Sequence, residues 1–114
     1  MGYEIVELFA RERAITYAGD IATPERPHSD GVGSVRLEVS REEDWAGAVE
    51  TILDKHGRID VLVKNAGSIA HEPLDALDLA GWQRVIAVNQ TGVFLGMRAA
   101  RERSHLIDKC EGRL

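Results

Sequence analysis

The chain has 114 residues, of which 44% are hydrophobic and 29% are charged. This is the composition of a soluble globular protein of one domain and excludes a disordered chain. The formal net charge of −5 at pH 7 and the lack of a concentrated basic surface argue against nucleic acid as a partner.

The sequence carries no sign of secretion or of membrane insertion. Glu4 and Glu7 interrupt the first apolar residues, where a signal peptide would have an apolar block. The longest apolar tract, residues 85–97, contains polar residues and is shorter than the ~20 residues that span a bilayer. The single cysteine, Cys110, cannot form an internal disulfide, which favours a reducing compartment. We therefore expect a cytoplasmic protein without a membrane partner.

The first part of the chain predicts a helix followed by two short strands. Residues 3–12 place apolar side chains on one helical side. The run 14–19 is short and β-prone, and 34–39 alternates in the manner of a second strand. Residues 22–33 hold two prolines and two glycines without periodicity, so they are predicted to form a loop.

A helix, a strand and a long helix are predicted next. Ser40 and Glu43 have the spacing of a capping box, and Gly57 supplies a left-handed stop to the helix that follows. The run 59–63, "IDVLV", is apolar enough for a strand that helices cover on both faces. A long helix is expected from residue 78 past residue 100. This order of elements predicts a doubly wound α/β sheet.

The apolar stripes of the two helices predict part of the core and one packing surface. Trp45 and Trp82 fall on these stripes and are expected in the core. Small residues on the last helix would let another helix approach closely: Gly92, Gly96, Ala99 and Ala100. The histidines lack ligand spacing to any cysteine or carboxylate cluster, so no metal site is expected: His28, His56, His71 and His105.

Ligands of open α/β sheets bind at the carboxyl ends of strands, where Asp20, Glu38 and Val39 are predicted to lie. Asp20 follows Gly2 by 18 residues, close to the ~20 expected between a phosphate-binding glycine and a ribose-binding acid. A carboxylate there can accept hydrogen bonds from both ribose hydroxyls and would repel a 2′-phosphate. An aspartate after a strand is also a common turn former or helix cap, so both interpretations stay open.

Two further sites carry candidate functional residues. Asn65, Ala66 and Gly67 follow the 59–63 run, where small residues would let a flat ligand approach the backbone; a simple turn is the alternative. Asn89 lies on the apolar stripe of the last helix, where an unpaired buried amide costs about 1–3 kcal/mol. It either satisfies a local backbone carbonyl or holds a water or a reacting group.

Together these residues resemble the short-chain dehydrogenase/reductase family over nearly the whole chain. "GYEIVELFARERAITYAGDI" is similar to the family's first helix and second strand, with Gly2 as the last glycine of its Thr-Gly-x-x-x-Gly-x-Gly loop. "LEVS" resembles the pair that contacts adenine, with Glu38 in place of Asp, and "KNAG" resembles Asn-Asn-Ala-Gly, with Lys64 in place of the first Asn. "WQRVIAVNQTGVFLGMRAA" is similar to the family's long interface helix.

The resemblance implies a partial Rossmann-type doubly wound parallel sheet that lacks its first strand and its C-terminal strands. The chain would be a single incomplete NAD(P)-binding domain, residues 1–114, truncated at both ends. NAD would be preferred over NADP because of Asp20, with binding weak or lost. The implied cofactor-binding residues are Gly2, Asp20, Glu38, Val39, Asn65, Ala66 and Gly67, and Asn89 is the implied member of the Asn-Ser-Tyr-Lys catalytic tetrad. Arg13 stands where the family generally has glycine.

In the family, a tyrosine acts as acid or base at the substrate oxygen while hydride passes to or from the nicotinamide. The tail 105–114 resembles the approach to the strand that carries the catalytic serine, and neither Tyr3 nor Tyr17 has a lysine four residues later. The chain is thus expected to be an incomplete NAD-linked alcohol/ketone oxidoreductase, inactive alone. The alternatives are a non-catalytic nucleotide-binding module, one that forms a homo- or hetero-oligomer through its 78–103 helix, or a truncated gene product without function.

Overall fold

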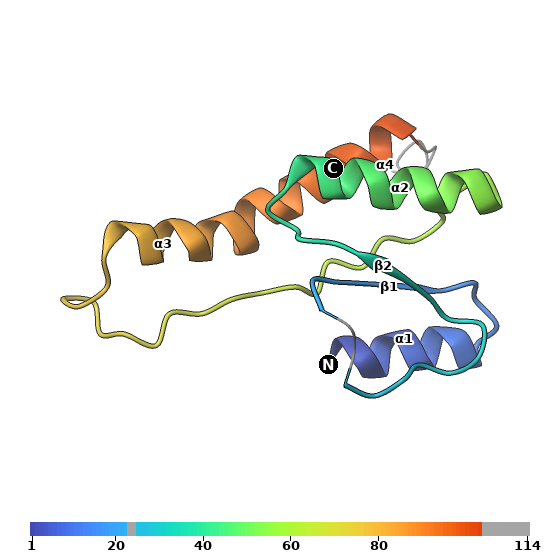
Figure 1. Ribbon diagram of the computed structural model, residues 1–114, viewed down its shortest axis with the longest axis horizontal. Coiled ribbons are helices and arrows are strands. Elements are labelled where there is room, and N and C mark those ends of the chain that lie inside the picture. The colour runs from blue at the N-terminus through green and yellow to red at the C-terminus, as the bar shows by residue number, and fades with distance from the viewer. Residues whose placement is uncertain (23–24, 104–114) are drawn as a thin grey trace, which may run out of the picture. The chain divides into compact units, whose positions relative to one another are not determined.

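The computed structural model describes residues 1–22 and 25–103 and divides the chain into two compact units, Met1–Glu38 and Val39–Leu114. The first unit contains α1 (Gly2–Arg11), β1 (Tyr17–Asp20) and β2 (Gly33–Arg36). The second contains α2 (Glu42–His56), α3 (Leu79–Ile86), the π-helical turn η1 (Ala87–Thr91) and α4 (Gly92–Arg103), as Figure 1 shows. The expectations for Cys110, His105 and the 105–114 tail lie outside the described residues.

The first unit is a two-stranded parallel sheet with one helix. Tyr17 of β1 lies opposite Gly33 of β2, and Asp20 lies opposite Arg36. Parallel strands need a crossover of a dozen or more residues, which the predicted loop between them supplies. A β-carbon at Gly33 would lie 2.4 Å from the Tyr17 ring, so the pairing requires a glycine there. The parallel sheet confirms the predicted α/β class.

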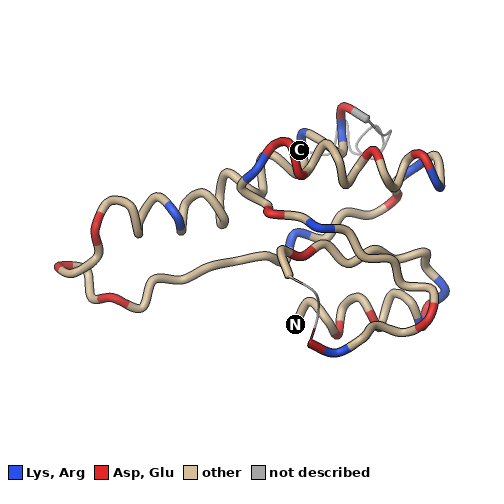
Figure 2. The backbone as a smooth tube through the Cα atoms, in the orientation of Figure 1, with Lys and Arg blue, Asp and Glu red and all other residues tan. Residues whose placement is uncertain are grey.

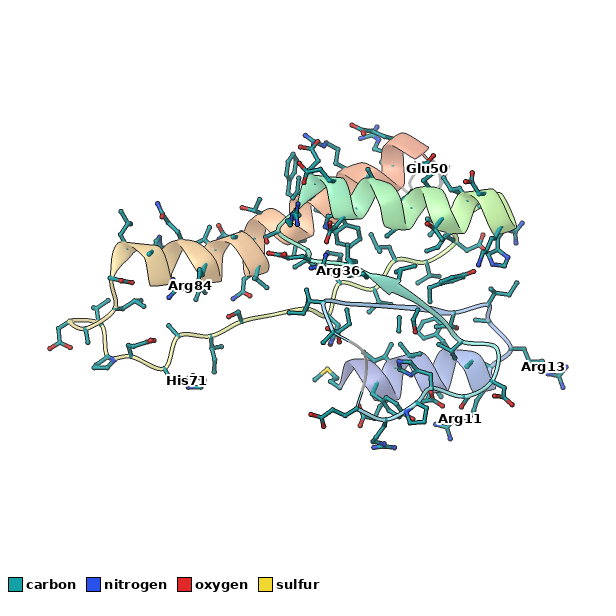
Figure 3. The ribbon with its side chains drawn as sticks, in the orientation of Figure 1. Arg11, Arg13, Arg36, Glu50, His71 and Arg84 are labelled. Carbon is teal, nitrogen blue, oxygen red and sulfur yellow. The ribbon has the colours of Figure 1, made fainter. Side chains whose placement is uncertain are left out.

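The turn between α1 and β1 contains a strained residue. Arg13 has a φ of 67°, in the left-handed region that favours glycine. Its N–H donates to the Ala10 carbonyl at 3.0 Å, and the Ala14 N–H donates to the Phe9 carbonyl at 3.0 Å. These bonds close the end of the helix, and the exposed Arg13 side chain points away from it (Figure 3). The conformation explains why glycine is implied at this position.

The bounds of α2 confirm one predicted signal and correct another. Gly57 has a φ of 75° and donates its N–H to the Leu53 carbonyl at 2.7 Å, as a left-handed stop should. The predicted cap position needs correction, because the N-cap residue is Arg41, one position after Ser40, and the Arg41 side chain makes no cap hydrogen bond. Acidic residues in the first turn still complement the helix dipole: Glu42, Glu43 and Asp44.

The predicted long helix is present but contains a π-helical turn. Asp78 is the N-cap of α3, and its Oδ1 accepts from the Gly81 N–H at 2.7 Å. The helix widens over η1 and continues as α4, which lies alongside α2 (Figure 1). Single π-helical turns occur frequently at functional sites, and Asn89 lies in this one.

The core of the second unit forms between α2 and α4. Its buried apolar residues are Trp45, Ala48, Val49, Leu95 and Ala100. The prediction for Trp45 is confirmed, since this residue is 4% exposed, whereas that for Trp82 is wrong, since it is 54% exposed on α3. The helix α3 extends beyond α2 (Figure 1), and its apolar side is only partly covered: Trp82 is exposed, whereas Val85 and Ile86 are half-buried.

The run 59–63 is not a strand, contrary to the prediction. Val61 and Val63 are 61% and 47% exposed, while Ile59 and Leu62 are half-buried. A strand exists only where a neighbour supplies its ladder of hydrogen bonds. In the described part of this unit no segment pairs with 59–63, so an apolar run that suits a buried strand stays unpaired.

We expect Arg13→Gly to stabilise the chain. Glycine adopts the left-handed conformation without a steric cost, which should raise the free energy of unfolding by about 1 kcal/mol. Urea denaturation at pH 7, followed by circular dichroism, measures this change. Arg13→Ala is the matched control, because it removes the same charge and keeps the strain. An equal gain in both variants would show that the charge, rather than the backbone, is responsible.

Candidate functional site

The predicted site residues are divided between the two units. The first unit holds Gly2, Asp20 and Glu38, and the second holds Val39, Asn65, Ala66, Gly67 and Asn89. Each group is therefore described within its own unit.

Gly2 and Asp20 lie at one end of the first unit. Gly2 begins α1 and Asp20 ends β1, and the helix and strand run in opposite directions against each other (Figure 1). Asp20 is exposed, and its Oδ1 accepts from the Ala22 N–H at 3.3 Å. Asp20 therefore does form a turn, one of the two predicted roles. An exposed carboxylate beside a helix N-terminus is also the arrangement that the ribose-binding role requires.

A cluster around Glu7 attaches the loop after Asp20 to α1. Glu7 Oε1 accepts from the Ser29 N–H at 3.0 Å and lies 3.2 Å from His28 Nδ1, and Oε2 accepts from the Ser29 hydroxyl. The Tyr3 ring stacks on His28, with centroids 4.9 Å apart, and the Arg26 guanidinium lies 4.3 Å from the Tyr3 centroid. Hydrogen bonds from the hydroxyl and then the N–H of Ser29 lower the pKa of Glu7.

In the second unit, Asn89 is paired with the backbone of Ser68. Its Oδ1 accepts from the Ser68 N–H and its Nδ2 donates to the Ser68 carbonyl, both at 2.8 Å. The amide therefore satisfies a backbone carbonyl, one of the two predicted roles, although this carbonyl lies 21 residues earlier. Gly67 lies close by, since a β-carbon there would be 3.7 Å from Asn89 Oδ1.

Lys64 contacts an aromatic ring. Its Nζ lies 4.0 Å from the centroid of the Trp45 ring, well inside the ~6 Å range of a cation–π contact. Burial lowers the pKa of Lys64 to about 8. The ring is itself fixed, because Trp45 Nε1 donates to the Val39 carbonyl at 2.9 Å.

The small residues of α4 pack within this unit. A β-carbon at Gly92 would lie 2.9 Å from Val39 Cγ2, and one at Gly96 would lie 2.7 Å from the Trp45 ring. Ala100 is 1% exposed. Another helix therefore does approach this side closely, as predicted: Trp45 of α2 lies against Gly96, and Val39 lies against Gly92.

Three contacts were not anticipated from the sequence: the Glu7 cluster, the Ser68–Asn89 pair and the Lys64–Trp45 contact. Their partners are separated by about 20 residues, and no local periodicity connects them.

Basic and acidic positions are interspersed along the described residues (Figure 2). Within those residues, no group of three or more His, Cys, Asp or Glu could hold a metal ion, and no helix is long and apolar enough to cross a membrane.

Comparisons with known proteins identify relatives of this arrangement. The family profile described as short chain dehydrogenase matches residues 1–114. Cyclopentanol dehydrogenase from Comamonas sp. is 36% identical over 110 residues, which are 90% of this chain and 44% of that protein. The 3-alpha-(or 20-beta)-hydroxysteroid dehydrogenase of Mycobacterium bovis is 36% identical over 104 residues, 87% of this chain and 40% of its own. The chain thus spans less than half the length of these curated relatives.

Solved structures share the fold. The ligand-free aldohexose dehydrogenase of Thermoplasma acidophilum has a TM-score of 0.82 at 24% identity, over 95% of this chain and 41% of that one. A short chain dehydrogenase from Leptospira borgpetersenii with bound NAD+ has a TM-score of 0.82 at 19% identity, over 89% of this chain and 40% of that one. The arrangement of strands and helices is therefore that of a partial Rossmann-type fold.

We expect Glu7→Gln to lower the Tm by a few degrees at pH 7 and by less at pH 3. The folded-state pKa of Glu7 is lowered, so its carboxylate stabilises the fold above the usual pKa of about 4.3 and loses this effect as the pH falls further. Thermal denaturation at both pH values measures the difference. Glu12→Gln, at the C-cap of α1, is the control, and a Glu7→Gln effect of equal size at both pH values would contradict the expectation.

We expect Asn89→Ala to release the Ser68 backbone. Loss of two hydrogen bonds should lower the free energy of unfolding by about 1 kcal/mol and accelerate amide exchange at Ser68. Urea denaturation and hydrogen exchange followed by NMR measure the two effects. Gln90→Ala, on the same π-helical turn, is the control. Unchanged exchange at Ser68 in Asn89→Ala would disprove the structural role of this pair.

Proposed function

Because the chain belongs to the short-chain dehydrogenase family, we propose that it is the cofactor-binding part of an NAD-linked oxidoreductase that acts on alcohols or ketones. The names of its relatives, a cyclopentanol dehydrogenase and a hydroxysteroid dehydrogenase, support hydroxyl-bearing substrates. The proposal rests above all on one observation: the exposed residues 65–67 lie directly before Ser68. The Asn89 side chain bonds both the N–H and the carbonyl of Ser68.

Residues 65–67 fit a flat ligand. Asn65, Ala66 and Gly67 are exposed, and two of them present almost no side chain. The Asn89 amide prevents the following residue from moving away, so the backbone can form a fixed surface beside a bound ring. When bound, NAD would supply the acceptor for hydride. This chain would supply the surface along which it lies.

The first unit by itself fits the adenosine end of a dinucleotide. The exposed carboxylate of Asp20 would accept hydrogen bonds from the ribose hydroxyls and repel the 2′-phosphate of NADP, and Gly2 would let the pyrophosphate approach the start of α1. Glu38 and Val39 would contact adenine. The NAD+ bound by the Leptospira relative supports this choice of cofactor, and the predicted cytoplasmic location accords with it.

Asn89 would hold a water as well as the Ser68 backbone. An amide has two N–H groups and an oxygen with two acceptor positions, and Ser68 uses one of each. Because Asn89 is exposed, its remaining N–H and lone pair can reach solvent. This arrangement supports the role of the tetrad asparagine, which orders water near the catalytic lysine.

Residues 1–114 contain no Tyr-x-x-x-Lys pair, so we propose that this polypeptide alone transfers no hydride.

A second candidate function is an NAD-binding or helix-pairing module that forms a homo- or hetero-oligomer. It is favoured by four large apolar side chains exposed along the 78–103 helix: Leu79 at 68%, Trp82 at 54%, Phe94 at 52% and Met97 at 48%.

We expect purified 1–114 to bind NADH at least about tenfold more tightly than NADPH and to oxidise or reduce nothing in an alcohol and ketone panel. Asp20→Ala should remove the preference and weaken NADH binding by about tenfold, a loss of ~1.4 kcal/mol. Isothermal titration calorimetry measures the affinities, with Asp30→Ala in the same loop as the control.

The other outcomes separate the alternatives. Cofactor-dependent turnover would overturn the expected inactivity. A lack of NADH binding in a chain that unfolds cooperatively would favour the helix-pairing module. A lack of binding together with a non-cooperative transition would favour a truncated product without function.

A further inference from the structure

Lys64 is held in a defined place beside the exposed residues 65–67. The side chain is half-buried, with its Nζ 4.0 Å from the centroid of the Trp45 ring. A β-carbon at Gly96 would lie 2.7 Å from Cζ2 of that ring and 3.0 Å from Nζ of Lys64. The lack of a side chain at Gly96 thus lets both the ring and the amine fit against α4.

The Trp45 ring is a rigid support for this amine. It is 4% exposed in the core between α2 and α4, and its Nε1 donates to the Val39 carbonyl at 2.9 Å. A ring fixed by packing on one side and by a hydrogen bond at its edge cannot follow the lysine if the chain moves. The contact therefore restrains Lys64 rather than Trp45.

The segment that follows Lys64 is thus held at both ends. Lys64 is placed on Trp45 and Gly96, and Ser68 is bonded twice to Asn89. The three residues between these points are exposed. Holding both ends of so short a segment limits the conformations of its backbone, and a ligand that lies along it then has less entropy to lose.

We propose that Lys64 and Trp45 are positioning residues for the cofactor. The lysine amine, held on the indole face, fixes the start of the 65–67 segment. The inference rests on the proposed function, because it assigns to this segment the part that lies along the dinucleotide. Neither residue takes part in hydride transfer. The second amide of the Asn-Asn-Ala-Gly motif remains as Asn65, and the contact with the ring replaces what the first amide would supply.

The protonation state of Lys64 is set by burial and by the ring. Among the described residues no carboxylate forms an ion pair with it: Glu42 of α2 pairs with Arg98 of α4, and Glu43 lies 4.0 Å from Arg41. Arg98 also lies 3.8 Å from Glu102. Burial lowers the pKa of Lys64 to about 8, whereas the indole face favours the charged form. The amine is therefore charged at pH 7 and loses its proton, and with it the cation–π attraction, as the pH rises past 8.

The first experiment reads the contact from the fluorescence of Trp45 and needs no cofactor. In a Trp82→Phe background Trp45 is the only tryptophan, because the chain has two. We expect its emission to titrate with a midpoint near 8, the pKa of Lys64. Lys64→Met should abolish this titration, and Lys64→Arg, which keeps a cation over the ring, should retain the emission of the charged form to pH 10. Lys55→Met, in the last turn of α2, is the control and should titrate like the parent.

The second experiment measures the position of the segment itself. Hydrogen exchange followed by NMR should show the Ser68 amide, which donates to Asn89 at the end of the segment, exchanging about tenfold faster in Lys64→Met, with Lys64→Arg restoring most of the protection. Circular dichroism establishes that each variant is folded. If Lys64→Met does not fold, Lys64→Arg compared with the parent above and below pH 8 gives the same test, because only the parent loses its cation. Unchanged exchange in either comparison would overturn the proposal.

The third experiment connects the contact to the cofactor. Calorimetry should show NADH binding weakened about tenfold in Lys64→Met and nearly restored in Lys64→Arg. Parent-like affinity in Lys64→Met would overturn the positioning role. If the parent chain binds no NADH, the proposed function fails. Faster hydrogen exchange in Lys64→Met would then still support Lys64 as the residue that positions the segment. Unchanged exchange would overturn this positioning role too.

Discussion

The second unit depends on the burial of one indole ring between α2 and α4. Trp45 fills the space that Gly96 leaves, and its N–H satisfies the carbonyl of Val39. Val39 in turn packs against Gly92, so the chain that enters α2 is held against the start of α4. A buried N–H without an acceptor is costly, and this hydrogen bond therefore determines both the depth of the ring and the path of the chain before α2. Lys64 then rests on the outer face of the same ring.

The first unit is organised by a different interaction, the carboxylate of Glu7. The strands β1 and β2 are parallel, so a long crossover must return along the unit, and no helix lies in the part of it that the structure describes. Glu7 binds that crossover to α1 through Ser29 and His28. A loop with two prolines and two glycines has little tendency to order itself. One acidic residue on α1, Glu7, supplies the missing restraint.

The contrast between the two tryptophans shows where prediction from sequence stops. Both fall on apolar helical stripes, and local periodicity treats them alike. Trp45 is 4% exposed because α4 covers it, and Trp82 is 54% exposed because α3 has no such neighbour among the described residues. The same reasoning applies to 59–63, whose composition suits a buried strand but whose hydrogen-bonding partners must come from elsewhere. Periodicity describes the surface that an element could bury, and a neighbouring element decides whether it does.

The sequence by itself determined the family, the α/β class, the helices, the loop between the two strands, the left-handed stop at Gly57 and the site candidates from Gly2 to Asn89, since motifs and turn signals are local. Only the tertiary structure decided that Asn89 pairs with Ser68, that Lys64 lies on Trp45, that Glu7 holds Ser29 and that the glycines of α4 receive Val39 and Trp45. These contacts join residues about 20 or more positions apart. Their partners are selected by which surfaces packing brings together, and no short-range pattern in a chain encodes that choice.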